Sequence, residues 1–204
     1  MPKKVDPDVQ RLSLARAGLA VIAAEGLEAA TLRKIAAHAG CTTGTVTHYF
    51  PDRSALLRAA LDAACQTTAR RMYQAARDAP THLEKLEALL REAVPLDDER
   101  RGEARVWLAF WGAASEDPVL IAAHERRMAD WRGLIRAVLQ PLLNAKADVD
   151  HEVLRLCALV DGLCVRGALC PDDLAEKRAR AAEIERVLDA HVADLKRQFR
   201  KDVA

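Results

Sequence analysis

Several features that mark large classes of protein are missing from this sequence of 204 residues. Lys and Arg (31) nearly balance Asp and Glu (30), which excludes a strongly basic nucleic-acid coat and an acidic disordered chain. No apolar run approaches the roughly 18 residues of a membrane span, and residues 1–6 lack the pattern of a signal peptide. We therefore expect a cytoplasmic protein that does not bind membranes.

The five cysteines are odd in number and scattered, and they form no CxxC pair. This usage is typical of reduced thiols and argues against a disulfide framework or a zinc site. The sequence also lacks HExxH, GxSxG, a phosphate-binding loop, and an acid pair at useful spacing on one helix. We therefore expect no enzyme, no cofactor and no metal site.

Glycine (9) and proline (8) are few, alanine and leucine are abundant, and β-branched runs are absent. This composition predicts an all-α protein. Apolar residues recur at helical spacing in about nine segments, separated by capping residues, glycine and proline. The expected helices are residues 8–25, 31–39, 42–50, 52–79, 80–95, a helix that carries residues 107–111, 117–139, 148–169 and 172–199. Residues 97–101 are expected to form a charged connector.

In the first expected helix, the spacing predicts one apolar stripe. It comprises Leu12, Ala15, Leu19, Ile22 and Ala23.

Residues 31–50 form two short helices joined by a tight turn, a pattern that predicts a helix-turn-helix. In the second of these helices, Val46 and Phe50 are an apolar pair that should face a small core. The other side chains are short or hydrogen-bonding, and Gly44 lets the backbone approach a neighbour closely. Such a helix can lie in the major groove of DNA with its outward side chains at the base edges. The alternatives are a solvated connecting turn and a helical interaction module without a DNA role.

The stretch TLRKIAAHAGCTTGTVTHYFPDRSALL, residues 31–57, resembles the TetR family of bacterial repressors. The resemblance implies an all-α protein with an N-terminal three-helix DNA-binding domain (residues 1–55). It further implies a C-terminal helical ligand-binding and dimerisation domain (residues 56–204). A homodimer would bind a palindromic double-stranded DNA operator and be released by a small-molecule inducer. Thr47 departs from the family, which usually has an aromatic residue there, so the operator sequence cannot be transferred.

The same resemblance implies the DNA contacts. Arg33 is the best candidate for a bidentate contact with guanine, whereas Arg53 matches a family position that grips phosphate. The full set is Thr31, Arg33, Lys34, Thr42, Thr43, Gly44, Thr45, Thr47, His48, Tyr49 and Arg53.

Two C-terminal segments, WLAFW at residues 107–111 and LVDGLCVRGAL at residues 159–169, resemble the choline-responsive repressors of the BetI type. Tryptophan faces attract quaternary ammonium groups, and a carboxylate such as that of Asp161 would add charge. The predicted pocket comprises Trp107, Phe110, Trp111, Met128, Trp131 and Asp161. Plain core packing of the tryptophans, and pairing of Asp161 with Arg105 or Arg166, are the alternatives. Cys164 replaces a tryptophan of this subgroup, so an unrelated apolar or aromatic inducer is a further alternative.

The last two expected helices would form the dimer interface, because in the family they pair with their mates as a four-helix bundle. One stripe of the eighth helix should lie there: Leu154, Ala158, Gly162 and Val165. Cys157 and Cys164 are seven residues apart on one face and could meet their mates across this interface. A thiol-based redox sensor is therefore another alternative.

Overall fold

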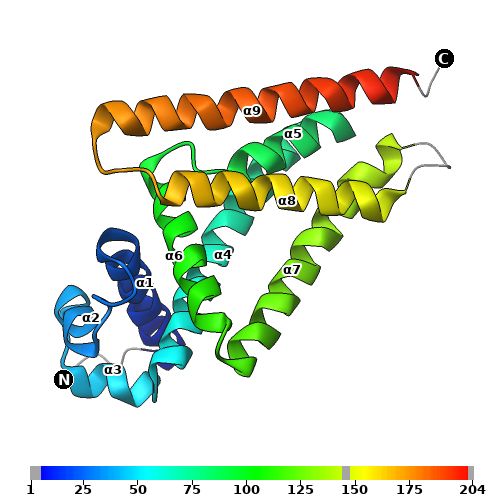
Figure 1. Cartoon of the computed structure of the whole chain (residues 1–204). Helices are drawn as coiled ribbons and strands as arrows, with labels where there is room; N and C mark the ends of the chain where they lie inside the picture. Colours follow the sequence, from blue (N-terminus) through cyan, green and yellow to red (C-terminus); the bar gives the residue numbers. More distant parts are fainter. Residues whose placement is uncertain (1–5, 144–147, 202–204) are drawn as a thin grey trace. The chain divides into compact units, whose positions relative to one another are not determined.

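The computed structural model describes residues 6–143 and 148–201. Over these two ranges the chain forms nine α-helices, one short 3₁₀ helix and no strand, which confirms the all-α prediction (Figure 1). The helices are α1 (Pro7–Glu25), α2 (Leu32–His38), α3 (Thr43–Tyr49), α4 (Arg53–Arg77), α5 (His82–Ala93), α6 (Asp98–Ala114), α7 (Pro118–Leu139), η1 (Gln140–Leu142), α8 (Val149–Ala168) and α9 (Leu174–Lys201). None of the helices in the described part of the chain has the length and apolar character needed to cross a membrane.

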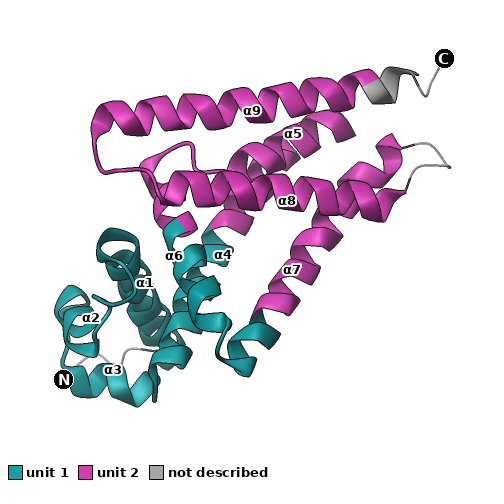
Figure 2. Ribbon diagram, viewed as in Figure 1, with its two compact units in different colours: residues 1–67, 105–123 teal, residues 68–104, 124–204 magenta. Residues whose placement is uncertain are grey.

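The chain divides into two compact units (Figure 2). Unit 1 contains Met1–Thr67 and Arg105–Ala123, and unit 2 contains Thr68–Ala104 and His124–Ala204. Helices α4, α6 and α7 therefore each contribute to both units. The predicted domains, residues 1–55 and 56–204, separate the expected DNA-binding part from the expected ligand-binding part, whereas the compact units reflect how the chain packs. The predicted boundary stays a prediction.

Unit 1 is built on a core in which α1 packs beside the two short helices. Its largest fully buried side chains include Leu14, Ile35, Phe50 and Phe110. The apolar stripe predicted for α1 is only partly right, because Leu12 and Leu19 are partly buried whereas Leu14 and Val21 are in the core. Apolar residues occupy most of the circumference of α1, so their spacing does not select the buried face.

Unit 2 is built on α5, α7, α8 and α9. Helices α8 and α9 lie side by side (Figure 1), and α5 contacts α9. The core they share includes Leu86, Leu90, Ile135, Leu156 and Leu188. Helix α7 ends at Leu139, immediately before the 3₁₀ turn that contains Pro141, as the sequence predicts.

The charged connector expected at residues 97–101 is wrong in part. Residues 98–101 form the first turn of α6, and the Asp97 carboxylate accepts a hydrogen bond from the backbone N–H of Arg100 at 2.8 Å. Acidic residues favour a helix N-terminus because they interact with its exposed N–H groups and with the helix dipole. The charge run is thus the start of a helix.

Candidate nucleic-acid interface

The α2–α3 turn is held by local hydrogen bonds. The hydroxyl of Thr31 accepts from the N–H of Lys34, and that of Thr42 accepts from the N–H of Thr45, each at 3.2 Å. At the end of α2, Gly40 adopts a φ of 65°, which lets Cys41 N–H donate to the carbonyl of Ala36 at 2.9 Å. These bonds satisfy the helix ends and fix the direction in which α3 leaves the turn.

Helix α3 has one buried and one open face. Val46 and, just beyond the helix, Phe50 are completely buried, which confirms that this pair faces the core. The open face is formed by four exposed residues, and Thr45 and Tyr49 are half-buried beside it. The exposed residues are Thr43, Gly44, Thr47 and His48. A Cβ added at Gly44 would meet only the Thr42 hydroxyl, at 3.7 Å, so no neighbour in the described chain requires the glycine.

Two hydroxyl groups on α3 already have partners. Thr47 donates to the carbonyl of Gly44 at 3.0 Å, and the hydroxyls of Thr42 and Thr45 lie 3.0 Å apart. Since its proton is engaged, Thr47 can offer a base its oxygen as an acceptor and its methyl group.

Arg11 of α1 anchors the end of α3, a role that the sequence did not reveal. Its Nη1 donates to the carbonyl of Tyr49 at 3.1 Å, and its guanidinium carbon lies 5.0 Å from the centroid of the Phe50 ring. A cation at the C-terminus of a helix and over an aromatic face is favourable in both respects. The partners are 38 residues apart, so no local pattern marks the contact.

The three basic DNA-contact candidates differ in their partners. Lys34 pairs with Glu25, and Arg53 donates to the Leu27 carbonyl at 3.0 Å and to the Glu28 carboxylate at 2.9 Å. Arg33 is exposed, and the structure assigns it no ion pair in the part of the chain that it describes. Arg33 can therefore contact a ligand without breaking an ion pair, whereas Arg53 must first leave the carboxylate of Glu28.

The residues predicted to line a ligand pocket fall in both units. In unit 1, the rings of Trp107 and Trp111 lie 6.0 Å apart and are half-buried, and Phe110 meets Trp107 edge to face at 6.2 Å. Phe110 is completely buried, so it belongs to the core of unit 1. In unit 2, Met128 and Trp131 on α7 are half-buried.

Asp161 on α8 is half-buried, and burial raises the pKa of its carboxyl above the ordinary value. The charge of His124 on α7 acts against this rise. The two arginines considered as its partners are engaged elsewhere, because Arg166 pairs with Glu183 and Arg105 donates to the carbonyl of Ala23 at 3.2 Å. A carboxylate in this setting gains from a cation placed against it.

The stripe predicted as a dimer interface on α8 is open in the single chain. Leu154 is 61% exposed, Ala158 and Gly162 are exposed, and Val165 is half-buried. A meeting of Cys157 and Cys164 with their mates across this surface stays a prediction, and the structure of the single chain does not favour it. Cys157 is buried in the core of unit 2, and the Cys164 thiol donates to the carbonyl of Ala93 at 3.3 Å. Burial raises the pKa of the Cys164 thiol to about 12 and that of Cys157 above its usual value, so both resist the ionisation that redox chemistry needs.

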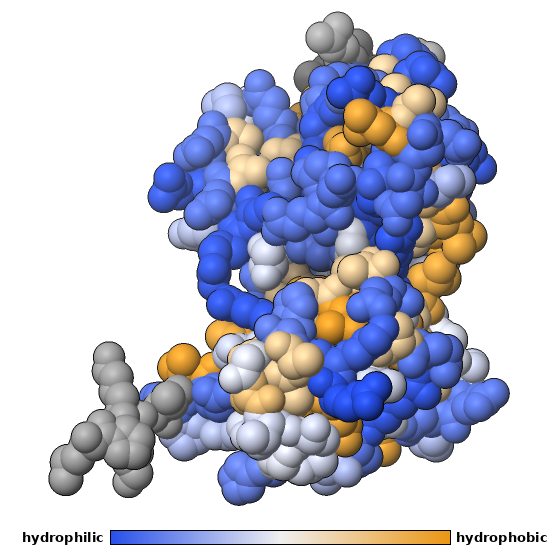
Figure 3. All heavy atoms as spheres, turned by 90° about the vertical axis from the view of Figure 1, so that its left-hand side faces the viewer, coloured by the Kyte–Doolittle hydropathy of each residue, from blue (hydrophilic) through white to orange (hydrophobic). Residues whose placement is uncertain are grey.

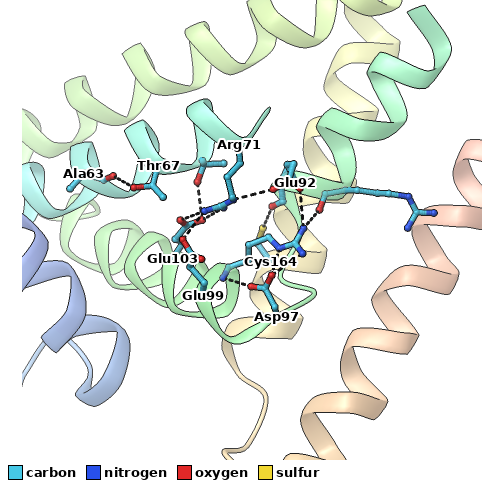
Figure 4. A network of polar contacts seen from close by, with 12 residues as sticks. Ala63, Thr67, Arg71, Glu92, Asp97, Glu99, Glu103 and Cys164 are labelled. Carbon is cyan, nitrogen blue, oxygen red and sulfur yellow. Dashed lines mark hydrogen bonds and ion pairs between the residues drawn. The ribbon is translucent and has the colours of Figure 1, made fainter. Parts of the chain in front are cut away.

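Unit 2 also holds a polar network that the sequence analysis missed (Figure 4). Arg71 makes two hydrogen bonds to the Glu103 carboxylate, at 2.6 and 2.8 Å, and further bonds to Glu92 and Glu99 at 3.0 and 3.1 Å. The Thr68 hydroxyl donates to Glu103 at 2.8 Å. The hydrogen bonds to Glu103 raise the pKa of Arg71 above its already high value. The network joins α4, α5 and α6 through charges.

Two protein-family models match the chain. The model of bacterial regulatory proteins of the tetR family covers residues 14–60, and that of the C-terminal domain of BetI-type transcriptional repressors covers residues 82–196. Together they include both the helix-turn-helix and most of unit 2.

Known proteins are similar over most of the chain. The HTH-type transcriptional regulator PksA of Bacillus subtilis is 34% identical, with 96% of this chain and 94% of PksA covered. BetI of Burkholderia mallei is also 34% identical, with 88% and 92% covered. A transcriptional regulator of Rhodococcus sp. RHA1 is 27% identical with a TM-score of 0.70, with 88% and 96% covered. A regulator of Saccharomonospora viridis, solved in complex with choline, shares the fold at 22% identity and a TM-score of 0.68, with 90% and 97% covered.

Proposed function

Because the chain belongs to the TetR family of transcriptional regulators, with a C-terminal domain of the BetI type, we propose that it is a repressor controlled by an inducer. It is a DNA-binding regulator and not an enzyme. In the proposal a homodimer binds a palindromic operator, and a small cation such as choline releases it. The observation that carries the proposal is the open face of α3, formed by polar side chains on a helix whose other face is fixed in the core.

In the proposed complex, the open face of α3 reads bases and the surrounding residues hold phosphates. Arg33 grips a guanine through its N–H groups, and Thr47 contacts a base through its methyl group and oxygen. Lys34 and Arg53 exchange their carboxylate partners for phosphates. The other contacts come from the caps and from α3: Thr31, Thr42, Thr43, Gly44, Thr45, His48 and Tyr49.

The proposed dimer forms through α8 and α9. The α8 stripe exposes Leu154, Ala158 and Gly162, and α9 exposes Val187, which is 42% accessible. Apolar side chains gathered on neighbouring helices favour association with a second copy. A two-fold dimer of this kind would place the two α3 helices in successive major grooves, about 34–36 Å apart, and so requires a palindromic operator.

The proposed inducer is a quaternary ammonium compound. Trp107 and Trp111 offer aromatic faces, and Asp161 offers a half-buried carboxylate that a cation would neutralise. The choline complex of the Saccharomonospora regulator supports the ligand class. An unrelated apolar or aromatic inducer is the alternative, favoured by Cys164, which stands where the subgroup has tryptophan.

Inducer binding would act by a population shift. The ligand favours a conformation in which the spacing of the two DNA-binding domains does not match the operator. The operator and the inducer therefore weaken each other's binding by the same factor. Titrating choline in the presence and absence of operator should therefore give two different affinities.

The operator is tested by recovering bound fragments of sheared genomic DNA from the source organism and sequencing them. The proposal expects one enriched palindrome, and no enriched sequence from a folded dimer at low salt would refute it. Choline should then release the operator and quench tryptophan fluorescence, while its uncharged isostere 3,3-dimethyl-1-butanol should do neither. If both compounds have equal effects, the proposed operator binding stands, but the proposal that the inducer is recognised as a cation fails.

A further inference from the structure

A pocket lies within unit 2, and its lining contains none of the residues proposed to bind the inducer. It encloses about 220 Å³ between the α5–α6 connection, the end of α8 and the first turns of α9. The lining residues are Pro95, Leu96, Asp97, Asp98, Arg101, Gly167, Cys170, Leu174, Lys177, Arg178, Arg180 and Ala181. Figure 3 views unit 2 from the side of the α8–α9 turn, where hydrophilic residues surround smaller apolar areas. We propose that this pocket binds a small organic carboxylate.

Arg101 is the observation that points to an anion. It lines the pocket with a side chain that is only 10% exposed, and its Nη2 pairs with Asp98 at 2.9 Å and with Asp172 at 3.0 Å. Its Nε and Nη1 are buried and have no hydrogen-bond partner in the part of the chain that the structure describes. Buried N–H groups of a guanidinium are costly to leave unpaired, and a carboxylate is the acceptor that suits them best.

The charge of the lining favours an anion. Four lining residues are basic and two are acidic. The Nζ of Lys177 pairs with Asp172 at 2.9 Å, whereas Arg178 is exposed and has no ion pair among the described residues. Helices α6 and α9 both begin at the pocket, so the positive ends of their dipoles add to the potential.

The remaining lining is apolar, which sets the kind of anion. Pro95, Leu96, Leu174 and Ala181 present hydrocarbon surface, and Gly167 closes the floor. A Cβ at Gly167 would come within 2.2 Å of Cγ of Pro95, so the helix and the proline can meet only because this residue is glycine. A mixed basic and apolar wall suits a carboxylate with a compact apolar body, and the cavity is small compared with the roughly 300–1,000 Å³ of drug-sized ligand sites.

The test uses the full-length protein and two carboxylate probes, benzoate and hexanoate, titrated by ligand-observed NMR. We expect saturable binding of at least one probe with a Kd of about 1 mM or lower, and no binding of the neutral benzamide. Saturable binding of neither carboxylate, or equal binding of benzamide, would overturn the proposal. So would inorganic phosphate binding in their place.

Two substitutions locate the binding. Ala181→Leu fills the pocket without removing a charge and should raise the Kd at least about tenfold. Arg178→Ala removes a cation that is not needed for folding and should raise the Kd about threefold. Arg186→Ala, the same change at another exposed position of α9, should leave the Kd unchanged. Wild-type affinity in both pocket variants would place the binding elsewhere and overturn the assignment. Because DNA is absent from the assay, its outcome is independent of repression.

Discussion

Glu28 holds Arg53, one of the residues proposed to bind phosphate, in an exposed ion pair. The Arg53 Nη2 donates to the Glu28 carboxylate at 2.9 Å and to the Leu27 carbonyl at 3.0 Å, and the two charged side chains are 54% and 91% exposed. If Arg53 grips phosphate, it must leave Glu28 first. Glu28→Gln should therefore raise the affinity for the operator, because it weakens the competing partner and keeps the shape of the side chain.

The size of the gain follows from the exposure of the pair. An exposed ion pair contributes about 0.2–1 kcal/mol. The proposed dimer has two such pairs, so the Glu28→Gln protein should bind the operator about twofold to thirtyfold more tightly. If each Arg53 contacts one phosphate, Arg53→Ala should make the salt dependence of binding shallower by about 0.9 per subunit, the slope of one phosphate contact.

Fluorescence anisotropy with labelled operator, repeated over a range of KCl concentrations, measures both quantities. Glu28→Gln also removes a negative charge near DNA, which would strengthen binding even without Arg53. The same substitution in an Arg53→Ala background isolates this general effect. An equal gain in the two backgrounds, or no gain in the wild-type background, would refute the contact between Arg53 and phosphate.

Four further predictions concern stability, assembly and chemistry. Glu103→Gln should lower the free energy of unfolding in urea by about 2–3 kcal/mol, because it removes the charged partner of Arg71; an unchanged midpoint would contradict this. Burial raises the pKa of Asp161, so the folded state binds its proton more tightly; the wild type should lose stability relative to Asp161→Asn as pH rises from about 3.9 through the raised pKa. Below that range the difference in unfolding free energy between the two proteins should no longer change with pH. A difference that is the same at every pH would exclude a link between the protonation of Asp161 and stability. Ala158→Asp should convert the proposed dimer to a monomer in sedimentation at low concentration, and unchanged sedimentation would reject the proposed interface. Treatment with peroxide should leave the operator affinity unchanged, because the Cys164 thiol, with its pKa of about 12, stays neutral. If peroxide releases the operator and a reductant restores binding, the redox-sensor alternative is supported instead.

Features that depend on neighbours in the sequence were predicted well. The two short helices joined by a tight turn and the buried pair of Val46 and Phe50 are all present, with Thr31 and Thr42 as caps and Gly40 in the turn. Each of these features depends on residues close together in the sequence. The causes are the N–H groups at a helix start that need a capping acceptor, a positive φ at glycine, and the helical spacing of apolar residues. Together these features predict the helix-turn-helix and the polar outward face of α3 from the sequence alone.

Features that depend on distant partners were not predicted. Arg71 and Glu103 are 32 residues apart, and Arg101 reaches Asp172 over 71 residues. In the sequence each is one of many charges on a helical chain, and only the packing shows which are buried together. The position of Cys157 could not be predicted for the same reason. Its spacing of seven residues from Cys164 is equally compatible with a dimer interface and with a buried core.

The support of α3 combines both kinds of feature. The turn at Gly40 fixes where α3 begins, whereas Arg11 holds its last carbonyl and covers Phe50 from α1. A recognition helix of seven residues is too short to be stable by itself, so its geometry depends on both ends. Rotation of α1 would therefore be passed to α3 directly, through a hydrogen bond and a cation–π contact. This gives a regulator of this family a physical route by which a small displacement of the reading head removes its fit to the major groove.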